Sequence, residues 1–217
     1  MLFKIPDVLS AEQRVELLTQ LKEAEFIDGK ITAGWYAKQV KQNQQLKGDD
    51  AKPLREQMIA ILKGNPLFQA AVRPKRIHHL LLSRYQPGMA YGTHADNALM
   101  GQWRSDVSFT VFLNDPQDYE GGELVIEGTD DEQTYKLPAG SALVYPSSAL
   151  HRVNEVTQGV RLVAVGWVQS WVRDPAQREL LFDLDTARRS LFAKHGKTDE
   201  FDLISKSVAN LLRQWAD

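Results

Sequence analysis

The pair of residues that most constrains this sequence is His94 and Asp96, which are separated by a single residue. Side chains two residues apart point to the same side only in an extended strand, whereas on an α-helix they diverge by about 200°. The pair ends the segment Tyr85-Gln-Pro-Gly-Met-Ala-Tyr-Gly-Thr-His94-Ala-Asp96, in which Gln-Pro-Gly is typical of a turn. The sequence therefore predicts a strand that presents an imidazole and a carboxylate together. Two such groups can occupy adjacent positions on a divalent metal ion.

A third ligand would complete the set of two histidines and one carboxylate that leaves three positions open on non-haem iron(II). The chain has five histidines, at positions 78, 79, 94, 151 and 195. His78 and His79 lie in an apolar strand pattern, and His195 lies in a polar connection between two predicted helices. His151 begins a predicted strand directly after a turn, a position at which ligands on a rigid scaffold are common. We therefore predict that His151 is the third ligand.

The composition limits the chemistry that this chain of 217 residues can perform. With 43% hydrophobic residues, 25% charged residues and a net charge of −2, it lacks the basic surface that nucleic acids or anionic membranes attract. The absence of cysteine excludes disulfides, thiolate catalysis and zinc sites built on cysteine. The first residues lack the apolar run of a signal peptide, and no segment approaches the ~20 apolar residues that span a bilayer. We expect a cytoplasmic protein with no nucleic-acid or membrane partner.

Helices are predicted at both ends of the chain. A capping-box pattern opens a helix over residues 10–25, and a second helix is predicted from Asp49 or Asp50 to Leu62. Near the other end, Asp174 is a suitable N-cap and is followed by proline. Apolar residues then recur at helical spacing in two segments.

Between these helices the sequence changes to short strands separated by turns. The predicted strands are 77–85, 107–113, 123–127, 134–137, 142–145, 151–156 and 160–168. Short strands at close spacing favour a sandwich or barrel of the jelly-roll kind. We therefore expect a mainly β fold with flanking helices. Its first domain would cover 1–172, with a helical part over 1–75 and a β core over 76–172, and a C-terminal helical appendage would cover 173–217.

Arg161 is the charged residue in the otherwise apolar run Arg161-Leu-Val-Ala-Val-Gly-Trp. A guanidinium that points into a β sandwich is costly unless an anion pairs with it. If Thr157-Gln-Gly159 is a three-residue hairpin loop with its glycine in the left-handed conformation, His151 shares a face with Arg161. A two- or four-residue loop would break this parity. A site with a metal at one end and a guanidinium at the other suits a small dicarboxylate that chelates the metal and pairs with the arginine.

Taken together, these motifs resemble the iron(II)/2-oxoglutarate-dependent dioxygenases. The prolyl 4-hydroxylase-like branch is similar in four segments: Tyr85-x-x-Gly-x-x-Tyr91-x-x-His94-x-Asp96, Asn114-Asp, Tyr119-Glu-Gly-Gly-Glu123 and His151-Arg-Val-Asn-Glu-Val-Thr-x-Gly159-x-Arg161. Two upstream segments resemble the bacterial PKHD-type hydroxylases, a group often linked to iron uptake: Asp28-Gly-Lys-Ile-Thr-Ala-Gly34 and Val40-Lys-Gln-Asn-Gln-Gln-Leu46. The resemblance covers nearly the whole chain and implies a double-stranded β-helix core of the jelly-roll or cupin-like kind.

The resemblance also implies a role for individual residues. His94, Asp96 and His151 would bind iron and form the catalytic centre. Arg161 would hold the far carboxylate of 2-oxoglutarate, and Tyr85, unless it only fills the core, would help to hold this cosubstrate. The carboxylate at position 96 favours hydroxylation, because the halogenating relatives carry a small residue there. The implied reaction uses O2 to convert 2-oxoglutarate into succinate and carbon dioxide as the substrate is hydroxylated, with ascorbate to rescue oxidised iron.

The sequence does not identify the substrate. The resemblance implies prolyl or peptidyl hydroxylation, or a small molecule linked to iron uptake. One alternative is a non-catalytic sensor that binds iron or 2-oxoglutarate without turnover. Another is a cupin-like zinc or manganese enzyme, which is disfavoured because such sites usually use three histidines and a glutamate. The helices at the two ends would suit packing against the β core or against another copy of the chain in a homo-oligomer.

Overall fold

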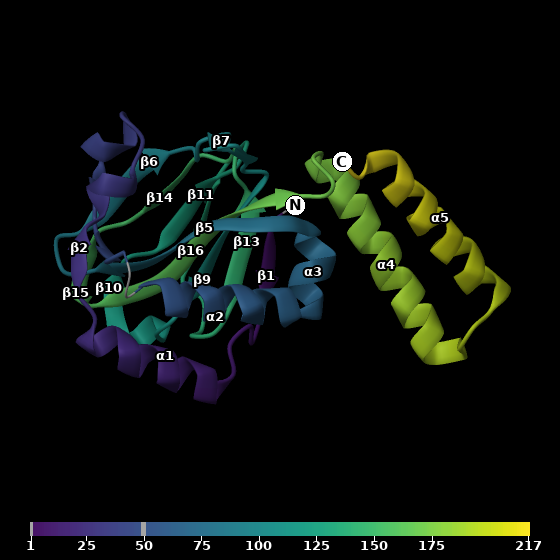
Figure 1. Ribbon diagram of the computed structural model, residues 1–217, viewed down its shortest axis with the longest axis horizontal. Coiled ribbons are helices and arrows are strands. Elements are labelled where there is room, and N and C mark those ends of the chain that lie inside the picture. Colours follow the sequence, from purple (N-terminus) through teal and green to yellow (C-terminus); the bar gives the residue numbers. More distant parts are fainter. Residues whose placement is uncertain (1, 49–50) are drawn as a thin grey trace.

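The computed structural model describes residues 2–48 and 51–217 of the chain. Within these residues two antiparallel sheets pack face to face (Figure 1). The seven-stranded sheet has the spatial order β1 (Phe3–Ile5), β13 (Ala142–Pro146), β9 (Val107–Phe112), β16 (Arg161–Ser170), β5 (Pro74–Tyr85), β4 (Gln44–Leu46) and β2 (Phe26–Asp28). The five-stranded sheet has the order β12 (Glu132–Tyr135), β11 (Leu124–Glu127), β14 (His151–Val153), β6 (Ala90–His94) and β3 (Lys41–Gln42).

Two short strand pairs and several helices complete the described part of the fold. The pairs are β10 (Tyr119–Gly121) with β15 (Val156–Gly159), and β7 (Leu99–Met100) with β8 (Trp103–Arg104). The α-helices are α1 (Ala11–Glu23), α2 (Ala51–Gly64), α3 (Pro66–Val72), α4 (Pro175–His195) and α5 (Asp199–Trp215). Three short 3₁₀ helices are η1 (Gly29–Thr32), η2 (Ala37–Gln39) and η3 (Pro116–Asp118). No helix in residues 2–48 and 51–217 is long and apolar enough to cross a membrane.

The larger sheet is buried on both faces, and strand alternation decides which side each residue occupies. In β5, Leu80 and Leu82 belong to the core on the helix side, whereas Leu81, Ser83 and Tyr85 face the space between the sheets. The same alternation in β9 and β16 sends one set of apolar side chains toward the helices and places the other set, which includes both polar and apolar residues, inside the sandwich. The interior face can therefore carry chemistry while the opposite face supplies the core.

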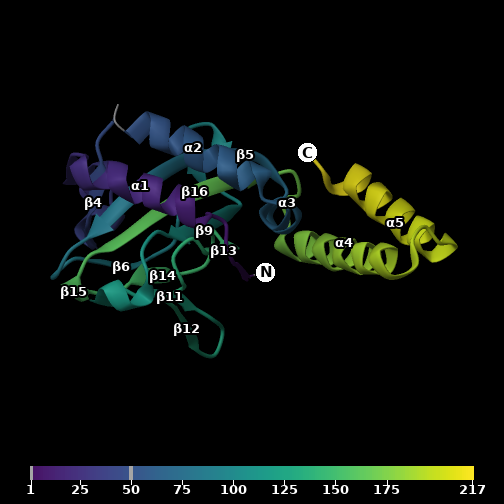
Figure 2. The ribbon, with the colours of Figure 1, turned by 90° about the horizontal axis from the view of Figure 1, so that it is seen from below.

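Helices α1 and α2 cover the outer face of the larger sheet (Figure 2). Helix α2 buries Leu54, Met58 and Leu62, which recur every four residues and so form one stripe. Helix α1 contributes Leu17 and Leu21 to the same core. Their burial stabilises the sheet that carries the polar interior residues.

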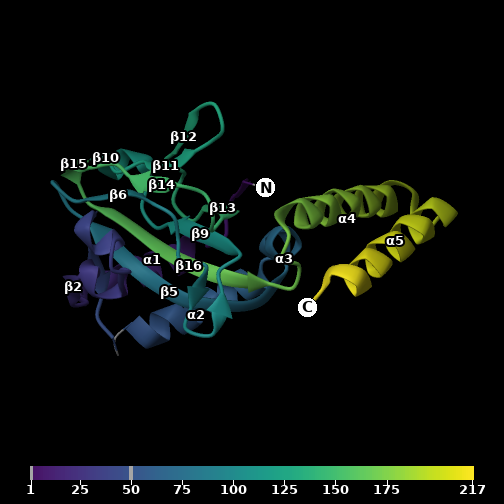
Figure 3. The same ribbon diagram turned by 90° about the horizontal axis from the view of Figure 1, so that it is seen from above.

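Helices α4 and α5 form a hairpin that extends away from the β core (Figure 3). The hairpin has a small core of its own, formed by Val172, Leu181 and Val208. It is attached to the rest of the chain by the edge-on contact of Phe182 with Phe3, whose ring centroids lie 4.9 Å apart, among other contacts. The division of the chain into a domain over 1–172 and an appendage over 173–217 stays a prediction.

The structure confirms the mainly β jelly-roll core and the helices at both ends. The helix predicted over 10–25 is α1, and the second predicted helix is α2, although its predicted start at Asp49 or Asp50 lies outside the described residues. Helix α3 is absent from the sequence prediction. It begins where the side chain of Asn65 accepts hydrogen bonds from two backbone amides of the first turn.

The predicted hairpin between strands 151–156 and 160–168 is wrong. The chain from 151 to 159 forms two strands, β14 in the smaller sheet and β15 paired with β10, and β16 lies in the larger sheet. The expected left-handed glycine is present, since Gly159 has φ of 75°, and an added Cβ there would lie 2.2 Å from the carbonyl oxygen of Asp118. Gly159 therefore marks the point at which the chain leaves the β10–β15 pair and enters the larger sheet.

The substitution Leu62→Ala tests how strongly the outer helices support the sheet. Leu62 is fully buried, so the variant should lose about 2–5 kcal/mol of unfolding free energy through lost apolar burial and the cavity left behind. Urea unfolding measures this loss. The exposed neighbour Lys63 is the control, because Lys63→Ala should change the same quantity by less than about 0.5 kcal/mol. Equal losses in the two variants would show that α2 does not support the sheet.

Candidate metal centre

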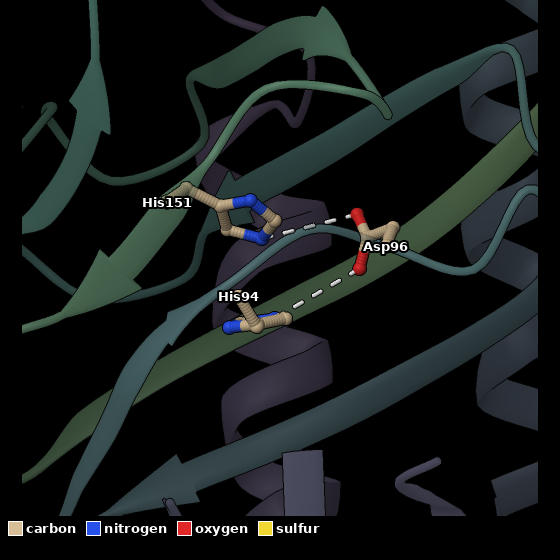
Figure 4. Close-up of side chains that lie close together, drawn as sticks. All are labelled: His94, Asp96 and His151. Carbon is tan, nitrogen blue, oxygen red and sulfur yellow. Dashed lines mark ion pairs between the residues drawn. The ribbon is translucent and has the colours of Figure 1, made fainter. Parts of the chain in front are cut away.

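Three side chains that could bind a metal meet between the two sheets (Figure 4). His94 ends β6 and lies directly opposite His151 of β14 in the pairing of these strands, and Asp96 follows two residues after His94. The Nε2 atom of His94 lies 3.9 Å from Asp96 Oδ1, and that of His151 lies 3.8 Å from Asp96 Oδ2. The structure thus brings together the three residues that the sequence predicts as ligands.

Backbone contacts set the proton position on both imidazoles. The Nδ1 atom of His94 lies 2.9 Å from the carbonyl oxygen of Gly92, and that of His151 lies 3.0 Å from the carbonyl oxygen of Ala149. Because a carbonyl only accepts hydrogen bonds, each Nδ1 carries the hydrogen, and each Nε2 keeps a free lone pair toward Asp96. Burial, together with the neighbouring His151, lowers the pKa of His94, so this imidazole is neutral at physiological pH.

The carboxylate of Asp96 is held by a pair of serines. The hydroxyl of Ser108, on β9, lies 2.6 Å from Asp96 Oδ2 and 2.8 Å from the hydroxyl of Ser147. Because Ser108 has one hydroxyl hydrogen, it donates to the carboxylate while Ser147 donates to Ser108. The backbone amide of Asp96 also donates to the carbonyl oxygen of Ser147 at 3.3 Å. These bonds connect the ligand to the larger sheet.

Two tyrosines pack against the imidazoles and restrict their ring planes. The ring of Tyr91 stacks on His94 with centroids 3.8 Å apart and an interplanar angle of 19°. Tyr145 contacts His151 edge-on, with centroids 5.1 Å apart. Burial raises the pKa of both tyrosines well above the usual range, so their hydroxyls stay protonated.

The three ligands open into a cavity of about 480 Å³ that also contains Arg161. This side chain is 1% exposed, and its Nε and Nη1 atoms have no hydrogen-bond partner among the described residues. Gly122 makes room for it, because a Cβ added there would lie 3.0 Å from Arg161 Cδ. A buried guanidinium with two nitrogens that lack partners is costly unless an anion pairs with it. The structure therefore places a cation in the cavity that holds the three ligands.

Tyr85 lies beside this arginine, as the sequence predicts for the cosubstrate site. The two residues are directly paired between β5 and β16, and the Tyr85 ring centroid is 5.0 Å from the guanidinium carbon of Arg161. The Tyr85 side chain is buried, which raises the pKa of its hydroxyl against the opposing effect of the Arg161 charge. A protonated phenol there can donate a hydrogen bond to the same anion.

The remaining histidines lie outside the metal-ligand cluster, as expected from the sequence. His78 Nε2 lies 2.9 Å from the carbonyl oxygen of Arg104, and its Nδ1 lies 2.9 Å from Nδ1 of His79. His195 is the last residue of α4. His79 lines the cavity at a β-bulge, where its φ is 50°. It does not belong to the cluster of His94, Asp96 and His151, whose ligand atoms all lie within 4.8 Å of one another.

The sequence reasoning missed one wall of the cavity. Lys41, Asn43 and Gln45 are 4%, 5% and 3% exposed and line it. Residues 41–45 are all polar, which is typical of an exposed loop, although every second residue is buried. The spacing of two is the signal that could have identified this wall as extended chain with one face inward.

The donor set fits iron(II). Two imidazole nitrogens and one carboxylate form one side of the site, and the cavity leaves the other side free for further ligands. This is the two-histidine, one-carboxylate arrangement of non-haem iron oxygenases.

Comparison with known proteins identifies the family. Residues 80–169 match the 2OG-Fe(II) oxygenase superfamily, and residues 175–217 match the PKHD-type hydroxylase C-terminal domain. The chain is 67% identical over 219 residues to a PKHD-type hydroxylase of Picosynechococcus sp., with 100% of both chains covered. It is 63% identical over 221 residues to one of Gloeothece citriformis, again with 100% of both covered. The chain belongs to the PKHD-type hydroxylases.

Solved structures share the fold of this PKHD-type hydroxylase at low sequence identity. A prolyl-4-hydroxylase of Pseudomonas putida is 21% identical, with a TM-score of 0.53 over 78% of this chain and 92% of its own. HygX of Streptomyces hygroscopicus, solved with nickel and 2-oxoglutarate bound, is 13% identical, with a TM-score of 0.57 over 79% and 84%. Family membership makes the chain an oxidoreductase of the 2OG-Fe(II) oxygenase type, which implies iron(II), 2-oxoglutarate and O2.

Removal of the Ser108 hydroxyl tests the support of the metal ligand. Ser108→Ala leaves Asp96 Oδ2 without this donor, so iron(II) should bind roughly 10- to 100-fold more weakly, as is usual when a hydrogen bond to a metal ligand is lost. Anaerobic titration with iron(II) measures the affinity. Ser207→Ala is the control, because that hydroxyl bonds only to its own helix α5. An affinity in Ser108→Ala equal to that of the control would contradict the assigned role.

Proposed function

We propose that the chain hydroxylates a C–H bond of its substrate and couples this to the oxidative decarboxylation of 2-oxoglutarate to succinate and carbon dioxide. The observation that carries the proposal is the meeting of His94, Asp96 and His151 with the unpaired Arg161 in one cavity. This combination suits a dicarboxylate oxoacid that reaches from the metal to the guanidinium. Family membership supports the same reading.

Each residue has a defined task in this proposal. His94, Asp96 and His151 would hold iron(II) on one side only, which leaves the cavity side free. Iron and 2-oxoglutarate, when bound, supply oxygen activation and the electrons that it requires. Arg161 would hold the far carboxylate, and the protonated Tyr85 would donate a hydrogen bond to it.

The cavity walls would protect the reaction from water. Leu81, Leu124 and Val165 line the space between the sheets, and apolar walls limit solvent access to the reacting groups. Ascorbate is proposed as the reductant that rescues oxidised iron, on the family resemblance alone. Prolyl or peptidyl groups, or a small molecule linked to iron uptake, are proposed substrates on the same basis, supported by the fold shared with a prolyl-4-hydroxylase.

The Arg161→Ala substitution tests the cosubstrate site. Iron(II) and 2-oxoglutarate are titrated into the apoprotein without oxygen, and the faint visible band of the iron–oxoacid chelate is recorded. Loss of a buried charge partner should raise the half-saturating concentration of 2-oxoglutarate at least about 30-fold. Arg152→Ala is the matched control, because Arg152 pairs with Glu132 and does not line the cavity. The band should be lost in His151→Ala, and no band in the intact protein would refute the open iron site.

Succinate formation separates the enzyme from a non-catalytic sensor. The intact protein with iron(II), 2-oxoglutarate, ascorbate and air should release succinate even without the primary substrate, because uncoupled turnover consumes 2-oxoglutarate and O2 while ascorbate supplies the two electrons that the substrate would otherwise give. Chromatography quantifies the product, with His151→Ala as the inactive control. A chelate band without any succinate would instead favour the sensor.

A further inference from the structure

Lys41 is a buried cation whose charge has no partner in the proposed reaction. Its side chain is 4% exposed and lines the cavity. Its Nζ donates to the hydroxyl of Thr32 at 3.0 Å and lies 5.2 Å from the ring centroid of Tyr91. Among the described residues no carboxylate forms an ion pair with it. A buried ammonium that gives one hydrogen bond to a hydroxyl keeps two further N–H donors.

The ammonium is held in position by a chain of hydrogen bonds. Lys41 donates to Thr32, and the hydroxyl of Thr32 lies 2.6 Å from Oε1 of Gln45, to which it donates. Lys41 lies on β3 of the smaller sheet and Gln45 on β4 of the larger one, so the segment closes one side of the sandwich. Between them, Asn43 is 5% exposed, and its Oδ1 has no partner among the described residues. Thus Lys41 lies in a buried polar wall, and its ammonium is a hydrogen-bond donor of that wall that can serve a carboxylate.

The charges of the loaded site leave Lys41 unbalanced. The formally charged residues of the described cavity lining are Lys41, Asp96 and Arg161. Iron(II), doubly charged 2-oxoglutarate, Asp96 and Arg161 together sum to zero, and Lys41 remains. Burial lowers the pKa of Lys41 to about 8, with the charges of Asp96 and, more weakly, Asp28 acting in the opposite direction, so the ammonium is still mostly charged at neutral pH. An uncompensated buried cation is costly, and an anion that enters the cavity would remove this cost.

We propose that Lys41, oriented by Thr32 and flanked by Asn43 and Gln45, binds a carboxylate of the primary substrate and positions that substrate beside the metal centre. The inference rests on the proposed function, because it takes the rest of the cavity to hold iron and 2-oxoglutarate. A carboxylate is favoured over a phosphate because a single ammonium matches a single negative charge. The same contact makes Lys41 a determinant of specificity, since a neutral analogue would leave the ammonium unpaired.

The test compares acids with their amides on protein loaded with zinc(II) and saturated with 2-oxoglutarate, which cannot turn over. The probes are N-acetyl amino acids with apolar, aromatic and polar side chains, each paired with its carboxamide. Ligand-observed NMR measures their dissociation constants and, through the 2-oxoglutarate signals, whether the cosubstrate is displaced. At least one acid should bind roughly tenfold or more tightly than its amide, without displacing 2-oxoglutarate.

Variants assign this preference to Lys41. Lys41→Met and Lys41→Gln should abolish the preference for the acid, and Lys41→Arg should keep part of it. Lys38→Met removes an exposed lysine from the same segment and should keep all of it. The proposal is overturned if no acid in the panel binds better than its amide, if the preference survives in Lys41→Met or Lys41→Gln, or if the acids displace 2-oxoglutarate. The acid–amide comparison in the intact protein stands even where a variant fails to fold.

The iron(II) titration described above separates this inference from the proposed function. If the intact protein forms no chelate band with iron(II) and 2-oxoglutarate, the proposed function fails, and the inference fails with it. If the band forms but acids and amides bind alike, the inference about Lys41 fails alone.

Discussion

The unpaired guanidinium of Arg161 is the constraint on which the rest of this structure depends. Within the part of the chain that the structure describes, its buried Nε and Nη1 atoms have no hydrogen-bond partner, and such a group is tolerated only where other interactions offset its cost. The larger sheet provides that support because its opposite face packs against α1 and α2. The apolar core between the larger sheet and the helices thus offsets the free-energy cost of the buried Arg161 charge on the opposite face of that sheet.

The metal ligands depend on a second constraint, the pairing between two strands of the smaller sheet. His94 and His151 are neighbours because β6 and β14 pair with these residues opposite each other. Each Nδ1 is then bonded to a nearby carbonyl, and the serines Ser108 and Ser147 fix Asp96 from the larger sheet. The site therefore joins both sheets. A shift of one residue in this register would turn the histidine away from its partner, so the fold and the site specify each other.

Local patterns in the sequence were enough for most of the elements and for the three residues that meet in the cavity, but not for helix α3 or for the connections between the sheets. The spacing of His94 and Asp96 and the isolated charge of Arg161 each predict a feature that the structure contains. The predicted hairpin gave the correct relation between His151 and Arg161 for the wrong reason, because β14 and β16 lie in different sheets. Local spacing cannot show which sheet a strand joins. The role of Gly159 as the point at which the chain enters the larger sheet depends on its contact with Asp118, which is distant in sequence.

The wall at Lys41 was missed for a related reason, and it connects the fold to the choice of substrate. A strand with one buried face is usually recognised by hydrophobic residues at every second position. The residues of this segment are polar at the buried positions too, so the sequence resembles a loop. Here the buried face is polar because it lines a cavity and not a core. The two cations of that cavity differ in kind: Arg161 is a planar fork that suits a carboxylate held at two points, whereas Lys41 is a compact charge that suits a single contact. If Arg161 is satisfied by the cosubstrate, the remaining positive charge lies at Lys41, and it favours the entry of an anion after 2-oxoglutarate is bound.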